Sequence, residues 1–209
     1  TARSNNTDVS LDLAYVTLKE FLYSPLTLTV GRQELRYGNA LIVGDPDTNG
    51  IADGHLTTSK YLPNSMDDLS LRKAFDAIKA TLNYDPLVVD LVYSKIDENR
   101  VNISDDVNLY GVNAAYTVNK ELSTEAYLWQ RSRKATGTGT IIDNSNREDL
   151  RTAGAKATYV GIKNTVLGLE GAFQFGDHMY NTALYTNENS STPPNRKVTA
   201  YAIQAVANR

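Results

Sequence analysis

Residues 45 to 53 carry oxygen-bearing side chains at the spacing of a calcium-binding loop. The candidate ligands are Asp45, Asp47, Asn49, Ile51 and Asp53. Four side-chain oxygens and the backbone carbonyl of Ile51 match the first nine positions of an EF-hand loop, with Gly50 at the sharp turn. The last position of that pattern, normally a bidentate glutamate, is Leu56. The sequence therefore makes calcium a candidate cofactor, and the alternative is a polar loop in which Asp-Pro, Asn-Gly and Asp-Gly pairs form turns.

No other cluster has the pattern of a catalytic site. The chain has no cysteine, and its two histidines, His55 and His178, fall in or beside long polar stretches. No Ser-His-Asp order, glycine-rich phosphate loop or metalloprotease helix is present. We expect a protein that is not an enzyme.

The composition excludes several classes of protein. The chain has 209 residues, of which 41% are apolar and 22% charged, with a net charge of −3. This balance lacks the basic field that nucleic-acid binding needs, so we expect no nucleic-acid partner. No continuous apolar stretch is long enough for a membrane helix. Strands of a membrane β-barrel remain compatible, because they alternate apolar and polar residues.

Nine segments have the alternation and the residue preferences of β-strands. They are residues 11–22, 26–38, 72–83, 87–96, 107–119, 122–133, 150–160, 166–175 and 197–208. Most are longer than the five or six residues usual in soluble proteins, and they approach the roughly 9–11 residues of a tilted membrane-spanning strand.

Short and long connections between these segments alternate along the whole chain. The short ones contain "YSP", "YDP", "KE" and "GIKNT". The long polar ones are approximately residues 39–71, 97–106, 134–149 and 176–196. Up-and-down outer-membrane barrels have short turns on one side and long loops on the other. We predict that residues 1–209 form a single all-β unit, an antiparallel up-and-down transmembrane β-barrel segment of about nine strands.

Alternation within the segments predicts which side chains face lipid and which face the lumen. In 166–175, Leu167, Leu169 and Phe173 share one face, and Glu170 and Gln174 share the other. The predicted pore-lining residues are Arg32, Glu34, Arg36, Lys79, Asp90, Asn113, Glu125, Arg131, Arg133, Lys156, Glu170 and Gln174. Facing charges of opposite sign would constrict the pore and favour polar solutes. Alternatively, these side chains pair with each other and fill space.

Two segments give an ambiguous alternation. In 26–38 the apolar and charged residues share one parity; they are Leu26, Leu28, Val30, Arg32, Glu34 and Arg36. We expect a bulge near Gly31 that turns the charges inward and leaves Leu35 and Tyr37 facing outward. In 122–133, the parity of Glu125 and Arg131 also includes two aromatic residues, Tyr127 and Trp129, and we assign that face to the lumen.

Several motifs resemble the alginate-export family of outer-membrane porins. They are "GRQEL" at 31–35 with "YG" at 37–38, "FDA" at 75–77 with Lys79, and downstream "DLVYSKIDE", "DVNLYGVNAAY" and "LEGAFQFGD". The resemblance covers nearly the whole chain. It implies a barrel of about eighteen strands in the bacterial outer membrane, of which this chain supplies about half. It also implies contact with outer-membrane lipid and passage of polar or anionic solutes, with exopolysaccharide export as one function.

An odd number of strands is unusual for a single-chain barrel. We therefore expect the remaining barrel strands to come from the same or another chain. The competing hypothesis from another class is a soluble or surface-exposed calcium-binding β-sandwich or adhesion module that uses the 45–53 loop.

Overall fold

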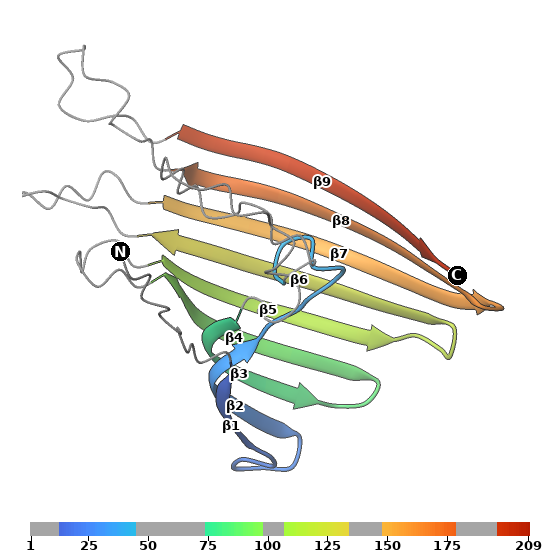
Figure 1. Cartoon of the computed structure of the whole chain (residues 1–209), viewed down its shortest axis with the longest axis horizontal. Helices are drawn as coiled ribbons and strands as arrows, with labels where there is room; N and C mark the ends of the chain where they lie inside the picture. Colours follow the sequence, from blue (N-terminus) through green and yellow to red (C-terminus); the bar gives the residue numbers. More distant parts are fainter. Residues whose placement is uncertain (1–12, 45–73, 98–106, 134–147, 179–195) are drawn as a thin grey trace, which may run out of the picture.

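The described strands form one antiparallel sheet. The computed structural model describes residues 13–44, 74–97, 107–133, 148–178 and 196–209. Its strands are β1 (Ala14–Leu18), β2 (Leu26–Glu34), β3 (Ala74–Asn83), β4 (Leu87–Asp97), β5 (Val107–Thr117), β6 (Leu122–Arg133), β7 (Glu148–Ile162), β8 (Thr165–His178) and β9 (Arg196–Asn208). Each strand pairs with the next along the chain, so the spatial order is β1 to β9 (Figure 1). The predicted all-β, up-and-down arrangement is confirmed. The sheet is open, with β1 and β9 at its edges.

Most strand boundaries lie within two or three residues of the predicted ones. The exceptions are β1, which is much shorter than the expected 11–22, and β2, which ends at Glu34 instead of near residue 38. Beyond Glu34 the chain leaves the sheet and crosses one of its faces.

The four short connections lie at one end of the sheet. They are residues 19–25, 84–86, 118–121 and 163–164. Turn chemistry explains two of them. Asn164 adopts a left-handed conformation with φ of 58°, which asparagine tolerates well. The side-chain oxygen of Asn119 accepts hydrogen bonds from the backbone N–H groups of Glu121 (2.8 Å) and Leu122 (2.9 Å). The alternation of short and long connections is therefore confirmed by the strand positions.

Residues 35–44, the inserted segment, lie against one face of the sheet (Figure 1). We call this side the covered face and the other the open face. A buried cluster joins the inserted segment to the covered face. Its members are Leu35, Tyr37, Val43, Phe75, Ala77, Val92, Leu109, Tyr127 and Trp129. The hydrophobic core of the described residues therefore lies between the inserted segment and a single sheet.

The open face carries an apolar band that runs across the whole sheet. One row in direct cross-strand register is Leu18, Leu28, Ala80, Leu91, Val112, Leu128, Ala153, Phe173 and Tyr201. The adjacent row toward the short connections is Leu26, Leu82, Val89, Ala114, Ala126, Ala155, Gly171 and Ile203. Neither row contains a charge. Tyr201 is 83% exposed and Ile203 75%, and no second sheet of described residues packs on them.

A polar rim borders this band on the side of the long connections. Its residues, again in register from β2 to β9, are Arg32, Asp76, Lys95, Asn108, Ser132, Asp149, Asp177 and Lys197. Between the rim and the band lie two packed tyrosines, Tyr93 and Tyr110, whose ring centroids are 5.2 Å apart. Further exposed tyrosines, Tyr23, Tyr84 and Tyr116, lie near the short connections. The open face therefore changes from apolar to polar over the distance of one or two residues in each strand.

The expected bulge near Gly31 is wrong. Pairing of β2 continues without a shift from Leu26 to Glu34 on the β3 side and from Leu28 to Arg32 on the β1 side. Arg32 and Glu34 therefore stay on the open face with the apolar residues of β2, and Arg32 forms an ion pair with Asp76 at 3.9 Å. Gly31 is needed for another reason, because it has φ of 125° and a Cβ atom there would collide with the backbone of Ala14.

The outward orientation expected for Leu35 and Tyr37 is also wrong. Both side chains are buried, and they belong to the cluster on the covered face. The chain has left the sheet by this point, so strand parity no longer determines where these side chains lie.

A glycine on the covered face makes room for the indole of Trp129. Gly111 is the cross-strand partner of Trp129, and a Cβ atom at Gly111 would overlap the six-membered part of that ring. We expect Gly111→Ala to lower the free energy of unfolding by about 1–3 kcal/mol, the usual cost of overpacking a tight core. Gly171→Ala on β8 is the matched control, because a Cβ atom there meets nothing within 4 Å. Denaturant titration followed by tryptophan fluorescence measures both; equal stability of the two variants would contradict this packing.

Candidate functional site

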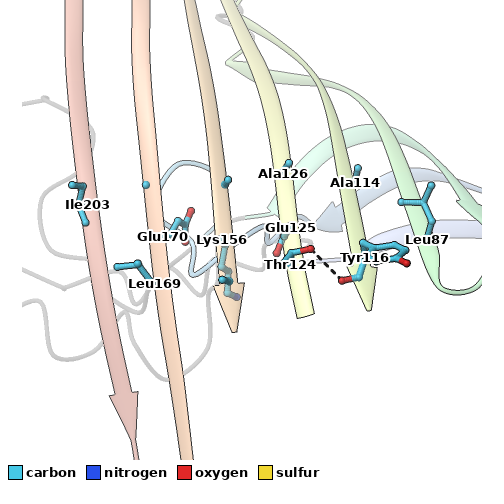
Figure 2. Close-up of a pocket in the computed structure, with 13 residues that line it drawn as sticks. Leu87, Ala114, Tyr116, Thr124, Glu125, Ala126, Lys156, Leu169, Glu170 and Ile203 are labelled. Carbon is cyan, nitrogen blue, oxygen red and sulfur yellow. Dashed lines mark hydrogen bonds between the residues drawn. The ribbon is translucent and has the colours of Figure 1, made fainter. Parts of the chain in front are cut away.

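Three charged side chains form a row across the middle of the covered face. Glu125 on β6 is in register with Lys156 on β7, which is in register with Glu170 on β8 (Figure 2). Opposite charges placed directly across from each other stabilise a sheet. The alternation predicted that all three residues share a face, and the structure brings them together as neighbours. We call these three residues the charged row.

The charged row binds the backbone of the inserted segment. The N–H of Gly38 donates to Glu125 Oε1 at 2.8 Å, and the N–H of Asn39 donates to Glu170 Oε2 at 2.6 Å. Lys156 Nζ donates to the carbonyl oxygen of Gly38 at 2.9 Å. Hydrogen bonds with an ionised partner are shorter and stronger than neutral ones. The charged row therefore binds the N–H groups of two consecutive residues of the inserted segment and the C=O group of the first of them, Gly38.

A tyrosine provides a second attachment point. The hydroxyl of Tyr37 donates to Asp90 Oδ2 at 3.0 Å, and its ring lies 4.8 Å from that of Trp129, centroid to centroid. The hydroxyl of Tyr127 donates to Glu170 Oε1 at 2.7 Å. Glu170, with none of its surface exposed, therefore accepts hydrogen bonds from both the inserted segment and the sheet.

Burial raises the pKa of the Tyr37 hydroxyl above its usual value, and the nearby Asp90 carboxylate raises it further. The folded-state pKa thus exceeds the unfolded one. The contribution of this hydrogen bond to stability is therefore complete below pH of about 10 and decreases as the pH rises above that value.

Only glycine fits at position 38. Gly38 has φ of 62°, and a Cβ atom there would lie 2.7 Å from Glu170 Cδ. We expect Gly38→Ala to weaken attachment of the inserted segment by about 1–3 kcal/mol, through backbone strain and displacement of the carboxylate. Gly168→Ala is the control, because its new Cβ would make ordinary contact with Asn39, 3.5 Å from Nδ2. The rate of limited trypsin cleavage after the exposed Arg36 measures how readily the inserted segment leaves the sheet. Equal cleavage rates in the two variants would contradict the prediction.

The other predicted pore-lining residues are distributed over both faces. Lys79, Asp90, Asn113 and Gln174 are on the covered face, and Gln174 Nε2 donates to the hydroxyl of Thr152 at 3.1 Å. Arg32 and Glu34 are on the open face, and Arg36 is an exposed residue of the inserted segment. The charged row and Asp90 are thus the members of the predicted set with described hydrogen bonds to the inserted segment.

A second ionic group lies nearer the long connections. Arg131 and Arg133 on β6 point to the covered face, and Arg131 forms an ion pair with Glu148, the first residue of β7. Sequence reasoning assigned Glu148 to a long connection and missed it. Its even spacing from Lys156 along the same strand is the signal that could have placed it on the covered face.

The five candidate calcium ligands, Asp45, Asp47, Asn49, Ile51 and Asp53, lie outside the described residues, so calcium binding stays a prediction. Within the ranges that the structure describes, no group of three or more His, Cys, Asp or Glu residues could hold a metal ion.

A hollow of about 640 Å³ lies over β4 to β9, lined mostly by open-face side chains (Figure 2). It exists because small residues, among them Ala114, Ala126 and Ala155, lie side by side between the larger Tyr116, Leu169 and Ile203. Most of its lining is apolar and includes residues of the apolar band, although Glu125, Lys156 and Glu170 also border it.

Neither a protein-family model nor a curated protein matches the sequence. The described part of the chain contains no helix that is both long enough and apolar enough to span a bilayer.

Proposed function

We propose that this chain forms part of the wall of a bacterial outer-membrane β-barrel channel that passes polar or anionic solutes. The apolar band of the open face carries this proposal. It is continuous across the nine strands, free of charge and exposed. Soluble monomers rarely expose an apolar surface that is continuous over so large an area.

The dimensions of the band fit a bilayer. In β8, ten residue steps separate Asp177 of the polar rim from Leu167 near the short connection. This corresponds to about 33 Å along a strand. For a strand tilted by about 45° it corresponds to about 23 Å of bilayer thickness, close to the roughly 25 Å apolar belt of outer-membrane barrels. The tyrosines at both borders match the aromatic girdles of such barrels.

The covered face suits a water-filled lumen, which the inserted segment narrows. Its described charged side chains are Lys79, Arg131, Arg133 and Lys156, and Asp90, Glu125, Glu148 and Glu170. Equal numbers of the two signs favour polar solutes in general. The resemblance to alginate-export porins supports an anionic polysaccharide as one such solute, with the remaining wall supplied by further strands of the same or another chain.

Reconstitution tests the proposal. The full-length protein is expected to need detergent, to run with heat-modifiable mobility on a gel, and to give discrete conductance steps in planar bilayers. Liposome swelling with neutral sugars and with uronic acids compares solute classes. A protein that stays monomeric in buffer without detergent and gives no conductance would contradict the proposal.

A further inference from the structure

A second cavity lies on the covered face, away from the charged row. It has a volume of about 300 Å³ and lies between the end of the inserted segment and the half of the sheet near the long connections. Val43, Phe75, Leu109 and Leu150 supply apolar walls. This volume is at the lower end of the range for small-molecule sites, so a molecule with a single ring fits better than a polymer.

Trp129, one of the residues that line this cavity, has an unsatisfied hydrogen-bond donor. Trp129 lines the cavity and is only 2% exposed, yet its Nε1–H has no acceptor among the described residues. A buried indole N–H normally has a partner. An acceptor atom of a bound molecule would satisfy it.

The described charged side chains at this cavity carry a net positive charge. Arg131 lines the cavity, and Arg133 lies two residues further along the same strand face. Glu148 is the carboxylate across from them on β7, where it pairs with Arg131. Among the described residues, two guanidinium groups and one carboxylate leave a net charge of +1 here, and the Arg131 side chain remains 41% exposed. Its remaining N–H donors can bind a second carboxylate.

We propose that this cavity is a binding site for small aromatic carboxylates. The ring would lie between the apolar walls, and the carboxylate would accept hydrogen bonds from Arg131 and from Trp129 Nε1–H. A sugar acid fits less well, because its hydroxyl groups would face Val43, Phe75 and Leu109 without partners. That the site binds solutes on their way through the pore rests on the proposed channel function. The binding of aromatic carboxylates does not depend on that function.

Trp129 is the only tryptophan of the 209 residues, so its fluorescence reports directly on this cavity. The protein in detergent micelles is titrated with benzoate, acetate, benzyl alcohol and glucuronate. Benzoate is expected to change the fluorescence saturably in the millimolar range. The other three probes are expected to bind at least about ten-fold more weakly, because each lacks either the ring or the charge. Trp129→Phe, followed by calorimetry, should weaken benzoate binding.

A double variant, Arg131→Gln with Glu148→Gln, removes the ion pair without leaving a buried carboxylate alone. It is expected to weaken benzoate binding by at least about ten-fold. Arg151→Gln is the control, because Arg151 lies on the open face of β7. Absence of saturable benzoate binding, equal binding of acetate or glucuronate, or an equal loss in the Arg151 variant would overturn the inference. Benzoate binding in a protein that gives no conductance would support the binding site and contradict the channel function. Conductance without benzoate binding would support the channel function and contradict the binding site.

Discussion

Replacing Leu128 with arginine is expected to lower the free energy of unfolding from a phospholipid bilayer by about 2–4 kcal/mol, the cost of a cation at the middle of the hydrocarbon region. Leu128 lies in the central row of the apolar band, between Val112 and Ala153, and is 47% exposed. In water the same substitution at an exposed site would change stability by no more than about 0.5 kcal/mol. Urea titration of the protein in phospholipid vesicles measures the difference.

The control lies two residues away on the same strand and the same face. Gln130 is in the row that borders the apolar band, beside Tyr110 and Arg151. Gln130→Arg should cost at most about 1 kcal/mol, because a cation near the interface reaches water. Leu128→Ala separates the loss of side-chain volume from the charge. If the Leu128 and Gln130 arginine variants were equally stable in vesicles, the open face would not be in contact with lipid.

The same two-residue alternation that made the strands predictable also explains the error in β2. The apolar residues of this strand, such as Val30, and its charged residues, such as Arg32, do share a face. No bulge is needed, because β2 passes from the apolar band into the polar rim between these two positions, where Asp76 pairs with Arg32. The alternation along one strand predicts which face of the sheet a residue lies on. Whether that part of the face is apolar or polar depends on the residues of the neighbouring strands, and the sequence of a single strand does not include them.

The charged row was predictable as a set of residues on one face, but its role was not. The contacts that define it join Gly38 and Asn39 to residues 87, 118 and 131 positions away in the chain. The inserted segment has no regular alternation that would reveal a docking face. The one local signal is Gly38, whose lack of a side chain permits both its backbone conformation and the approach of Glu170.

Replacing Glu170 with alanine is expected to release the inserted segment and to raise the single-channel conductance of the reconstituted protein. Glu170 is fully buried and accepts hydrogen bonds from Asn39 N–H and from the Tyr127 hydroxyl. Its loss leaves two buried donors unpaired, at about 1–3 kcal/mol each, and removes the carboxylate that lies directly across from Lys156. The segment regains hydration by leaving the sheet. Trypsin cleavage after the exposed Arg36 should therefore become faster, and the lumen of the proposed channel should become wider.

Two further variants separate this effect from a general loss of negative charge. Glu121→Ala removes a carboxylate from the exposed link between β5 and β6, and it should change neither cleavage nor conductance. Glu170→Gln keeps one acceptor oxygen, so it can satisfy one of the two donors and should give intermediate values of both. A folded Glu170→Ala protein with the cleavage rate and conductance of the parent would show that Asp90, Glu125 and Lys156 hold the segment without Glu170. Both substitutions of Glu170 remove the same charge. An intermediate result for the glutamine variant would therefore show that hydrogen bonding at position 170 holds the inserted segment on the sheet.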